Sequence, residues 1–437
     1  MLFKKILIAN RGEIAIRIIR TCKEMNIKTV SIHTKIDKNS LHTKLSDETI
    51  CIGKSYLNIK NIIAAAEITN ANAIHPGYGF LSENYKFSKT CKSHNIKFIG
   101  PSYEVIKKMS NKTNAKKIMK KNKLNIIWGS KKSLKNFKEG LEISKYIGFP
   151  IILKIENGGG GKGIKIVKQE KDFKFQWKNL KIELKSNNKK IYVEKFIKNP
   201  KHIEFQIIGN PNKKVYHLSE RECSIQNRYQ KLIEETPSLF VKKKIRKKIG
   251  NLIINTMKYI KYEGVGTIEF MVDERKKFYF IEMNARIQVE HTITEELTNI
   301  DIVKKQIYIA ANKNVIKKNF YPKSHIIQCR INAEDANNNF NPSPGKIKNI
   351  NFPGGKGVRI DSFIYPGYNI NYQYDSMIAK IITKDKNRNE CIKKMKRALG
   401  EFKIEGIKTT IPFHIKIMNN KKFILGNFTT EIINEWN

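Results

Sequence analysis

The segment 278–291, Phe-Tyr-Phe-Ile-Glu-Met-Asn-Ala-Arg-Ile-Gln-Val-Glu-His, constrains the fold of this chain more than any other part of it. Its aromatic and β-branched residues are typical of a strand. Because strand side chains alternate between two faces, we expect Glu282, Asn284 and Arg286 to share one face. A carboxylate and an amide oxygen suit Mg²⁺, an arginine binds anions, and Glu290 is a candidate base. The alternative is an amphipathic edge strand with a solvated polar face.

A second carboxylate lies on the run that precedes this segment. Residues 266–272, Gly-Thr-Ile-Glu-Phe-Met-Val, read as a strand, and a polar turn at 273–277 follows. This hairpin pattern places Glu269 beside Glu282. Two carboxylates on paired strands repel each other unless a cation lies between them. Together with Asn284 they are predicted to bind Mg²⁺ (or Mn²⁺), with two ions expected, against nucleotide phosphates.

A glycine run supplies the candidate phosphate lid. Four consecutive glycines lie between two β-type runs, Ile151–Ile155 and Ile164–Val167. The run is not a P-loop, because Gly163 follows Lys162 where serine or threonine would stand, and the next residues alternate as a strand. We interpret it as a hairpin tip whose backbone N–H groups close over phosphates, with Lys154 meeting a phosphate as a point charge. A plain mobile loop is the alternative.

These motifs resemble the ATP-grasp arrangement and, more narrowly, the biotin carboxylase family, the ATP-dependent subunit of bacterial acetyl-CoA carboxylase. The resemblance covers essentially the whole chain. Besides residues 280–291, it rests on Ile-Ala-Asn-Arg-Gly-Glu-Ile-Ala (8–15), Ala-Ile-His-Pro-Gly-Tyr-Gly-Phe-Leu-Ser-Glu-Asn (73–84), Tyr-Val-Glu-Lys (192–195), Ser-Glu-Arg-Glu-Cys-Ser (219–224), Cys-Arg-Ile-Asn-Ala-Glu-Asp (329–335), Pro-Ser-Pro-Gly-Lys (342–346) and Tyr-Asp-Ser-Met (374–377).

The fold class is predicted to be α/β and α+β, in several domains. Residues up to about 100 alternate strands and helices (5–9, 13–25, 28–33, 59–69 and 96–100), which indicates a parallel α/β domain. The resemblance implies an N-terminal Rossmann-like domain (1–110), an ATP-grasp domain (111–322) with a mobile lid (about 126–196), and a C-terminal biotin carboxylase domain (323–437). Segment 337–356 is predicted to be a loop, 378–383 a strand and 389–402 a helix.

The resemblance also implies roles for individual residues. The ATP site would comprise Lys112, Lys154, Gly160, Gly161, the hinge Glu194, Lys195, Phe196 and Ile197, His202 with Glu204 near the ribose, Tyr229, Glu269 and Glu282. The metal ligands would be Glu269, Glu282 and Asn284. Bicarbonate would meet Lys231 (with Gln226), Arg286, Gln288, Val289 and Glu290, and biotin would meet Arg330.

The implied chemistry follows from charge. Glu290 would deprotonate bicarbonate while the metal and Lys231 disperse charge on the γ-phosphate. The resulting carboxyphosphate would release CO₂ and phosphate, and that phosphate would deprotonate the ureido nitrogen of biotin. Arg330 would stabilise the enolate-like oxygen so formed. The alternative for Arg330 is a structural ion pair with Glu334 or Asp335.

Several positions depart from the family pattern. None of them removes a metal ligand, the base or the enolate clamp. They are Tyr229 in place of histidine, Asn157 in place of a lid glycine, Lys162 and Asn227 in place of arginines, Ala285 in place of threonine and Thr292 in place of proline.

The net charge of +45 would normally suggest nucleic acid as a partner. Lysine is instead spread along the chain with abundant isoleucine and asparagine, which we interpret as a compositional bias, and no nucleic-acid-binding motif occurs. Where lysine is so common, arginine marks positions that need planar, bidentate recognition. This favours Arg286 and Arg330 as substrate-binding groups, although a buried ion pair also requires arginine.

The six cysteines show no metal spacing or disulfide framework, and no apolar run reaches membrane-spanning length, so a cytoplasmic protein without a signal peptide is expected. No biotin-attachment motif occurs, and Lys394-Met-Lys396 lies in a helical run. We therefore expect the chain to act on biotin borne by a separate carrier protein, beside carboxyltransferase subunits. Arg20 and Glu24 match family positions at a homodimer interface. Two alternatives are a carbamoyl-phosphate synthase-like ligase and a non-enzymatic basic binding protein.

Overall fold

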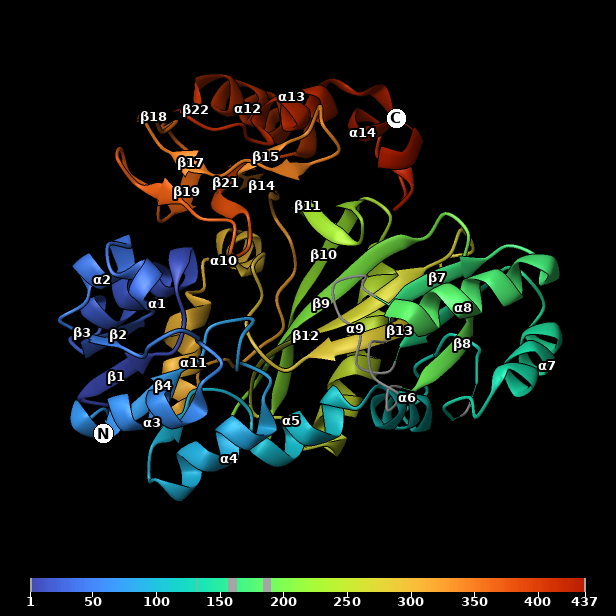
Figure 1. Cartoon of the computed structure of the whole chain (residues 1–437), viewed down its shortest axis with the longest axis horizontal. Coiled ribbons are helices and arrows are strands. Elements are labelled where there is room, and N and C mark those ends of the chain that lie inside the picture. Colours follow the sequence, from blue (N-terminus) through green and yellow to red (C-terminus); the bar gives the residue numbers. More distant parts are fainter. Residues whose placement is uncertain (1, 131, 156–162, 184–189, 436–437) are drawn as a thin grey trace.

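The computed structural model describes residues 2–130, 132–155, 163–183 and 190–435. Its N-terminal part is a five-stranded parallel sheet in the order β3-β2-β1-β4-β5 (Figure 1). The expected parallel α/β domain is thereby confirmed, although β3 and β4 are too short for periodicity to reveal. The strands are β1 (Lys5–Ile8), β2 (Lys28–His33), β3 (Glu48–Cys51), β4 (Ala73–His75) and β5 (Lys97–Phe98).

Helices cover this sheet and lead away from it. α1 buries Ile14, Ile18 and Cys22, which lie at helical spacing, against the strands. Four of the helices begin at an N-cap asparagine or serine whose side chain accepts a backbone N–H, the arrangement that satisfies an otherwise unpaired helix terminus. The elements are α1 (Gly12–Glu24), η1 (Lys35–Asp37), α2 (Leu41–Leu45), α3 (Ile59–Ile68), α4 (Tyr85–Ser93), α5 (Tyr103–Ser110) and α6 (Lys112–Lys121).

The centre of the molecule is an eight-stranded antiparallel sheet in the order β13-β12-β9-β10-β11-β14-β21-β19. It crosses the boundary predicted near residue 322, so the C-terminal strands extend the ATP-grasp sheet; that boundary stays a prediction. The strands are β9 (Lys201–Gly209), β10 (Val215–Asn227), β11 (Gln230–Thr236), β12 (Gly264–Val272), β13 (Phe278–Asn284), β14 (His325–Asn332), β19 (Val358–Ser362) and β21 (Met377–Asp385). The helices that pack on it include α9 (Lys243–Tyr259), α10 (His291–Thr298) and α11 (Ile302–Ala310).

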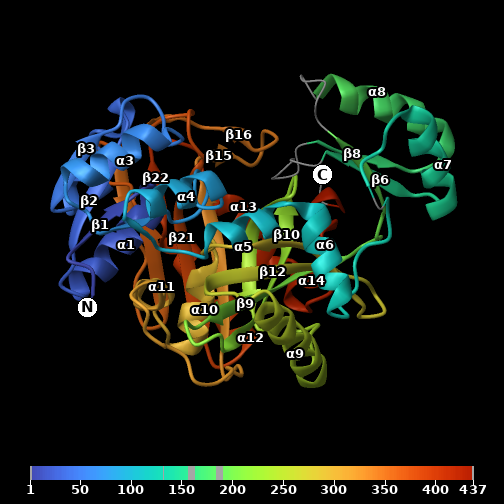
Figure 2. The same ribbon diagram turned by 90° about the horizontal axis from the view of Figure 1, so that it is seen from below.

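The predicted lid is a separate layer with a core of its own. Its sheet has the order β7-β6-β8, and its antiparallel β6–β7 pairing confirms the expected hairpin, whose glycine run lies outside the described residues. Leu153, Val193, Phe173 and Trp177 pack together inside it. Figure 2 shows it projecting from the body. The elements are α7 (Phe137–Ile147), β6 (Ile151–Ile155), β7 (Ile164–Val167), η2 (Glu170–Asp172), α8 (Phe173–Glu183) and β8 (Ile191–Lys195).

The C-terminal part places helices and short strands over one end of the central sheet (Figure 1). The predicted strand and helix are present as β21 and α12, and Lys394 and Lys396 lie on α12 as expected. Segment 337–356 is not the plain loop we expected, because three short strands cross it. The elements are β15 (Glu334–Asp335), β16 (Asn341–Pro342), β17 (Gly345–Lys346), β18 (Asn349–Asn351), β20 (Asn369–Ile370), α12 (Arg388–Glu401), β22 (Lys403–Glu405), α13 (Ile411–Asn419), α14 (Lys421–Ile424) and η3 (Ile432–Glu435).

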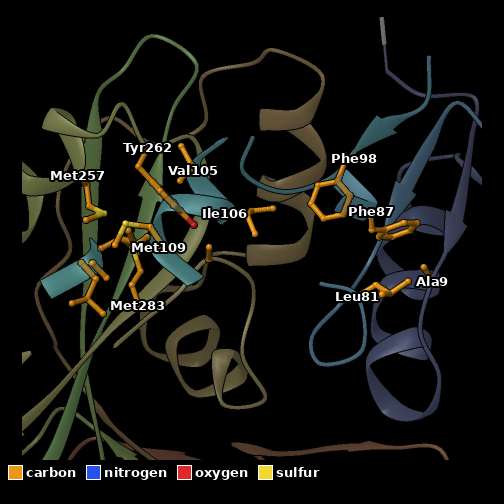
Figure 3. Packing of buried hydrophobic residues seen from close by; sticks show 14 of the residues in the cluster. Ala9, Leu81, Phe87, Phe98, Val105, Ile106, Met109, Met257, Tyr262 and Met283 are labelled. Atoms are coloured by element: carbon orange, nitrogen blue, oxygen red, sulfur yellow. The ribbon is translucent and has the colours of Figure 1, made fainter. Parts of the chain in front are cut away.

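One apolar cluster joins the N-terminal sheet to the central sheet. Figure 3 shows it running from Ala9 and Phe87, through Ile106 and Met109 on α5, to Met257 on α9. Burial of this kind stabilises by about 25 cal/mol per Å² of apolar surface. The two sheets are therefore held as one body, which fixes the loops of the N-terminal domain against the central sheet. Within the described residues, none of the helices combines the length and apolar character needed to cross a membrane.

Candidate active site

A cavity of about 400 Å³ opens between the central sheet and the lid. The structure brings most of the predicted site residues to its walls, although their roles stay predictions. Those on the walls are Lys112, Lys154, Lys195, Phe196, Ile197, His202, Tyr229, Lys231, Glu269, Glu282, Asn284, Arg286, Gln288, Val289, Glu290 and Arg330. Glu194 lies just behind the wall on β8, and Gly160 and Gly161 fall outside the described residues.

The hairpin of β12 and β13 places the two carboxylates as the sequence predicted, because Glu269 is the direct cross-strand partner of Glu282. Glu269 Oε1 accepts hydrogen bonds of 2.6 Å from both Asn284 Nδ2 and Gln288 Nε2. The Glu282 side chain is 38% exposed and faces Lys112 Nζ at 3.5 Å. Two carboxylates and an amide oxygen at one hairpin are a donor set that fits Mg²⁺.

Glu269 is held in its charged form. Burial raises its pKa, but the charges of Lys231 and His202 and the hydrogen bond from the His202 ring outweigh burial and hold the pKa far below the usual range. His202 Nε2 lies 2.8 Å from Glu269 Oε2, and its Nδ1 lies 2.7 Å from Gln226 Nε2. A permanently ionised carboxylate is the form that binds a metal ion.

Two lysines and one glutamate lie together at the end of the cavity where Lys154 lines the wall. Glu194 Oε2 receives Lys154 Nζ at 2.6 Å, and Lys116 pairs with its other oxygen. Burial and the neighbouring charges of Lys116 and Lys112 lower the pKa of Lys154 to about 7, while Glu282 opposes that shift. Burial also lowers the pKa of Lys116 to about 8. These cations are crowded, so an anion that entered would relieve their repulsion.

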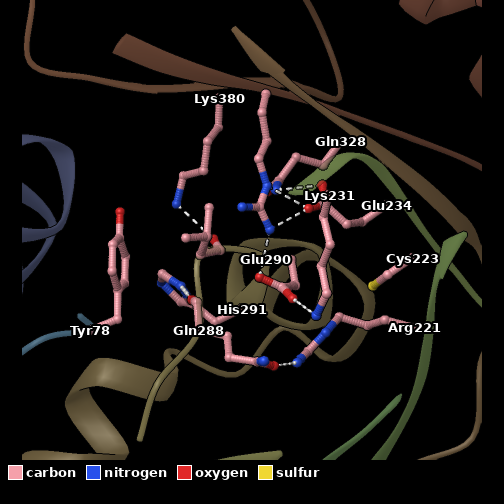
Figure 4. Close-up of polar contacts among 12 residues, drawn as sticks. Tyr78, Arg221, Cys223, Lys231, Glu234, Gln288, Glu290, His291, Gln328 and Lys380 are labelled. Carbon is pink, nitrogen blue, oxygen red and sulfur yellow. Dashed lines mark hydrogen bonds and ion pairs between the residues drawn. The ribbon is translucent and has the colours of Figure 1, made fainter. Parts of the chain in front are cut away.

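Lys231 is the electrostatic centre of the site (Figure 4). Its ammonium group lies 2.5 Å from Glu204, 3.2 Å from Glu269 and 2.7 Å from Glu290. The expectation that Glu204 reaches the ribose is wrong, because Glu204 is fully buried behind the wall and also accepts from Arg221 Nε at 2.5 Å. A carboxylate with no exposed surface does not reach a ribose in the cavity.

Arg221 is a site residue to which we assigned no role from sequence. Its guanidinium is fully buried and donates to Gln288 Oε1 at 2.6 Å and to Gln206, Thr267 and Thr294. It therefore fixes the orientation of Gln288, whose amide Nε2 points at Glu269. The sequence contained a signal for this role, since Arg221 lies in the family-like motif at 219–224 and only arginine supplies so many fixed donors.

Arg286 is anchored by a residue from the N-terminal domain. Its Nε donates to Glu83 Oε2 at 2.8 Å and its Nη2 to Asn284 Oδ1 at 2.8 Å. The backbone N–H of Ala285 donates to the other oxygen of Glu83, at 2.8 Å. Because the backbone supplies that bond, alanine in place of the family's threonine leaves this anchor in place. The importance of Glu83 was missed, although it belongs to the motif at 73–84.

The alternative proposed for Arg330 names the wrong partners. Its Nε donates to Glu234 Oε1 at 2.6 Å and its Nη2 lies 3.0 Å from Glu290 Oε2, whereas Glu334 and Asp335 lie on the following short strand. Glu234 comes from β11, the neighbour of β14 in the central sheet. Arg330 thus connects the predicted base to a fully buried carboxylate and faces the cavity.

Glu290 is poised as an ionised group. Burial raises its pKa, but Lys231, Arg330 and Arg221, with a hydrogen bond from Lys231, together hold the pKa well below the usual range. Such a carboxylate is always available to accept a proton, and it becomes a stronger base when a substrate draws Lys231 away. Until then the low pKa of Glu290 makes it a weak base, because a general base is most effective when its pKa lies near the working pH.

Tyr229, which departs from the family pattern, lies in the tight turn between β10 and β11 with φ of 66° and its side chain 48% exposed. Burial and the carboxylate of Glu431 raise its pKa, so the phenol stays neutral. Thr292, another departure, donates to Gln328 Oε1 inside the protein. Further polar wall residues to which the sequence assigned no role include Asn332, Asp375, Thr430 and Glu431.

A β-hairpin lid over a sheet that carries paired carboxylates and flanking lysines defines an ATP-grasp enzyme. Comparison with known families agrees: residues 111–318 match the ATP-binding domain of the carbamoyl-phosphate synthase L chain. The flanking parts match the biotin carboxylase N-terminal domain (2–106) and the biotin carboxylase C-terminal domain (328–435). Because both flanking domains match biotin carboxylase, they argue against the carbamoyl-phosphate synthase-like ligase that the sequence left as an alternative.

Individual proteins give the same result. A biotin carboxylase from Nostoc is 48% identical over 446 residues and covers 100% of both chains. A pyruvate carboxylase subunit from Methanothermobacter thermautotrophicus is 44% identical and covers 100% of this chain and 90% of the relative. The crystal structure of the biotin carboxylase domain dimer of Hydrogenobacter thermophilus 2-oxoglutarate carboxylase, in complex with MgADP, ADP and bicarbonate, superposes with a TM-score of 0.97 at 44% identity and covers 100% of this chain and 98% of that chain.

The chain therefore belongs to the biotin carboxylase family. This confirms the family and fold class expected from the sequence, and with them an ATP-dependent carboxylase of the ligase class.

Proposed function

We propose that this chain uses ATP and bicarbonate to carboxylate biotin carried on a separate carrier protein, as the first half-reaction of acetyl-CoA carboxylase. That reaction supplies malonyl-CoA for fatty acid synthesis. The observation that carries the proposal is the position of Lys231, which contacts the predicted metal ligand Glu269 and the predicted base Glu290 at once. One ammonium group between these two carboxylates suits a reaction in which bicarbonate attacks a phosphoryl group.

The ATP phosphates would meet Lys112 and Lys154, and the adenine would meet the hinge at residues 194–197, where Phe196 and Ile197 offer apolar walls. Glu269, Glu282 and Asn284 would hold Mg²⁺ (or Mn²⁺), which neutralises phosphate charge when bound. In the homologous Hydrogenobacter structure the nucleotide is MgADP. When ATP binds, Lys154 exchanges its ion pair with Glu194 for an ion pair with a phosphate, so it keeps an ionic partner throughout.

Bicarbonate would lie between Arg286, Gln288, the backbone of Val289 and Glu290. Arg286 and Gln288 are held in fixed directions by Glu83 and Arg221, so they need little reorganisation to bind an anion. Glu290 accepts the bicarbonate proton, and Lys231 moves with the developing charge toward the γ-phosphate. The product of attack is carboxyphosphate with ADP as the leaving group.

Biotin would follow in the same cavity once carboxyphosphate has released CO₂ and phosphate. The phosphate takes the ureido proton, and the oxygen that gains negative charge meets Arg330. Arg330 suits this role because Glu234 and Glu290 hold its planar guanidinium at the cavity wall. The enolate oxygen replaces one of these carboxylates as its partner.

Partners and location follow from the same proposal. The carrier protein brings biotin, and carboxyltransferase subunits take the carboxyl group onward in the cytoplasm. Arg20 and Glu24 are exposed one turn apart on α1, which supports the proposed homodimer interface. Subunits of pyruvate carboxylase and 2-oxoglutarate carboxylase are also similar to this chain. The second candidate function is therefore one in which pyruvate or 2-oxoglutarate accepts the carboxyl group.

Two measurements test the proposal. ATP hydrolysis by the purified chain should depend on bicarbonate and rise further with free biotin; hydrolysis indifferent to bicarbonate would overturn it. The acceptor is tested by adding the host's biotin carrier and carboxyltransferase with acetyl-CoA, pyruvate or 2-oxoglutarate in parallel and following labelled bicarbonate. Label in malonyl-CoA alone supports acetyl-CoA carboxylase, and label in a product of pyruvate or 2-oxoglutarate supports the second candidate.

A further inference from the structure

A lysine is completely buried behind the bicarbonate end of the cavity. Lys380 lies on β21 between the apolar residues Ala379 and Ile381, and none of its surface is exposed. Its ammonium group lies 3.0 Å from Glu13 Oε1 and donates to the carbonyl oxygen of Val289 at 2.9 Å. Fully buried lysines are rare and need partners, and this one has partners in two distant parts of the chain.

Glu13, on α1, connects the lysine to the N-terminal domain. The residue is 3% exposed, and its Oε1 also accepts a hydrogen bond of 2.5 Å from the hydroxyl of Tyr78, in the motif at 73–84. A second carboxylate, Asp361 on β19, lies 3.8 Å from Lys380. Figure 4 shows Tyr78 and Lys380 beside the segment that carries Gln288 and Glu290. Three parts of the chain thus meet at one ammonium group.

The bond to Val289 acts on the base through a single peptide plane. The Val289 carbonyl and the Glu290 N–H belong to the same planar unit, so a donor that holds the carbonyl also holds the start of Glu290. Glu290 is the N-cap residue of α10, and its side chain leaves this plane toward Lys231 at 2.7 Å and Arg330 at 3.0 Å. A rotation of the plane would move the carboxylate relative to both cations.

Stability alone is a weak reason for this arrangement. Buried ion pairs are often no more stabilising than apolar residues of similar volume, because both charges lose their hydration. Lys380 pairs across the sheet with Arg330 on β14 and Asp361 on β19, so a lysine at this position places a second buried cation beside Arg330. What an apolar side chain does not supply is a donor to the Val289 carbonyl.

We propose that Lys380 is a positioning residue for the bicarbonate step, holding the Val289–Glu290 peptide so that the Val289 backbone and the Glu290 carboxylate face bicarbonate together. Glu13 balances its charge, and Tyr78 holds Glu13. This inference rests on the proposed function of the same cavity.

The variant that tests it is the double substitution Lys380→Met with Glu13→Gln. Lys380→Met alone would strand the Glu13 carboxylate in the interior and unfold part of the population. The double variant keeps the side-chain volumes, leaves an amide oxygen for Tyr78 and removes both charges. The matched control is Arg246→Met with Glu220→Gln, a buried ion pair of 2.5 Å between α9 and β10 that does not line the cavity.

We expect kcat/KM for bicarbonate in the double variant to fall by about 10- to 100-fold, the scale of a catalytic group displaced by about an ångström. The KM for ATP and the slow ATP hydrolysis without bicarbonate should stay within about twofold of the wild type, because neither uses this peptide. The control variant should change none of these values, even if its melting temperature falls.

Two results would overturn the inference: a wild-type kcat/KM for bicarbonate in the folded double variant, or equal losses for bicarbonate and ATP. Failure of the proposed function would look different, since the wild-type chain itself would then show no dependence on bicarbonate.

Discussion

A substitution of Arg330 can separate biotin-independent ATP cleavage from carboxybiotin formation only if the buried carboxylate that Arg330 contacts is changed as well. Arg330→Ala removes the guanidinium proposed to stabilise the biotin enolate, but it also leaves Glu234, which has no exposed surface, with the Gln328 amide at 2.9 Å as its one remaining hydrogen-bond donor among the described residues. Stranding a buried carboxylate in this way costs about 3–5 kcal/mol of stability. A lower melting temperature is therefore expected from Arg330→Ala whatever its catalytic role.

The informative variant is Arg330→Ala with Glu234→Gln, which removes the stranded charge. Loss of one preorganised cationic donor should slow carboxybiotin formation by about 10²- to 10³-fold, which corresponds to about 2.7–4 kcal/mol of transition-state stabilisation. Biotin-independent ATP cleavage should fall far less. Loss of Arg330 raises the pKa of Glu290, but Lys231 and Arg221 still hold that pKa low, so the base stays ionised at neutral pH.

The assay compares two rates in one preparation: labelled bicarbonate fixed into carboxybiotin, and ADP released without biotin. The single substitution Glu234→Gln is the control for the altered environment of β11. Equal losses of both rates in the double variant, with Glu234→Gln near the wild type, would refute the role of Arg330 at biotin and leave it a structural residue.

Three further predictions test other parts of the site. Glu282→Gln should leave the fold intact, since that side chain is 38% exposed, but lower turnover by at least ~10³-fold; near-normal ATPase activity would refute the metal assignment. With the pKa of Lys154 at about 7 and phosphates favouring its charged form, ATP binding at about pH 8 should take up a proton and weaken as pH rises above 7. Calorimetry in buffers of different ionisation enthalpy measures this uptake, which Lys154→Arg should reduce while the contribution of Lys116, whose pKa is about 8, remains; no uptake by the wild type would contradict it. Duplex DNA should bind weakly, without sequence preference and with steep salt dependence, and tight binding at physiological salt would contradict our interpretation of the net charge of +45.

The local parts of the fold could be predicted because local rules decide them. Alternation and a polar turn define the β12–β13 hairpin, so the pairing of Glu269 with Glu282 followed from sequence. The spacing of apolar residues on α1 likewise reveals a helix. The short strand β3 carries no such signal, because half-buried and exposed residues alternate there over only 4 positions.

The contacts that organise the site could not be predicted in the same way. Glu83 and Arg286 are 203 residues apart, and Glu234 and Arg330 are 96 apart. Such pairs depend on strand order and on the docking of the N-terminal domain, which side-chain periodicity does not specify. The scarcity of arginine beside lysine pointed to Arg286 and Arg330, the cations of both pairs. It did not identify the carboxylates that they contact.

The charges inside the cavity are balanced locally, although the chain as a whole carries a net charge of +45. The two predicted carboxylate ligands of the metal already have lysine partners: Lys231 for Glu269 and Lys112 for Glu282. Substrate anions and a metal can enter together because they exchange partners, phosphate and bicarbonate taking the cations while the metal takes the freed carboxylates. Such an exchange alters the local net charge little, whereas entry of a phosphate alone would leave those glutamates unpaired. We therefore expect nucleotide and metal to bind cooperatively, since each provides the charge that the other displaces.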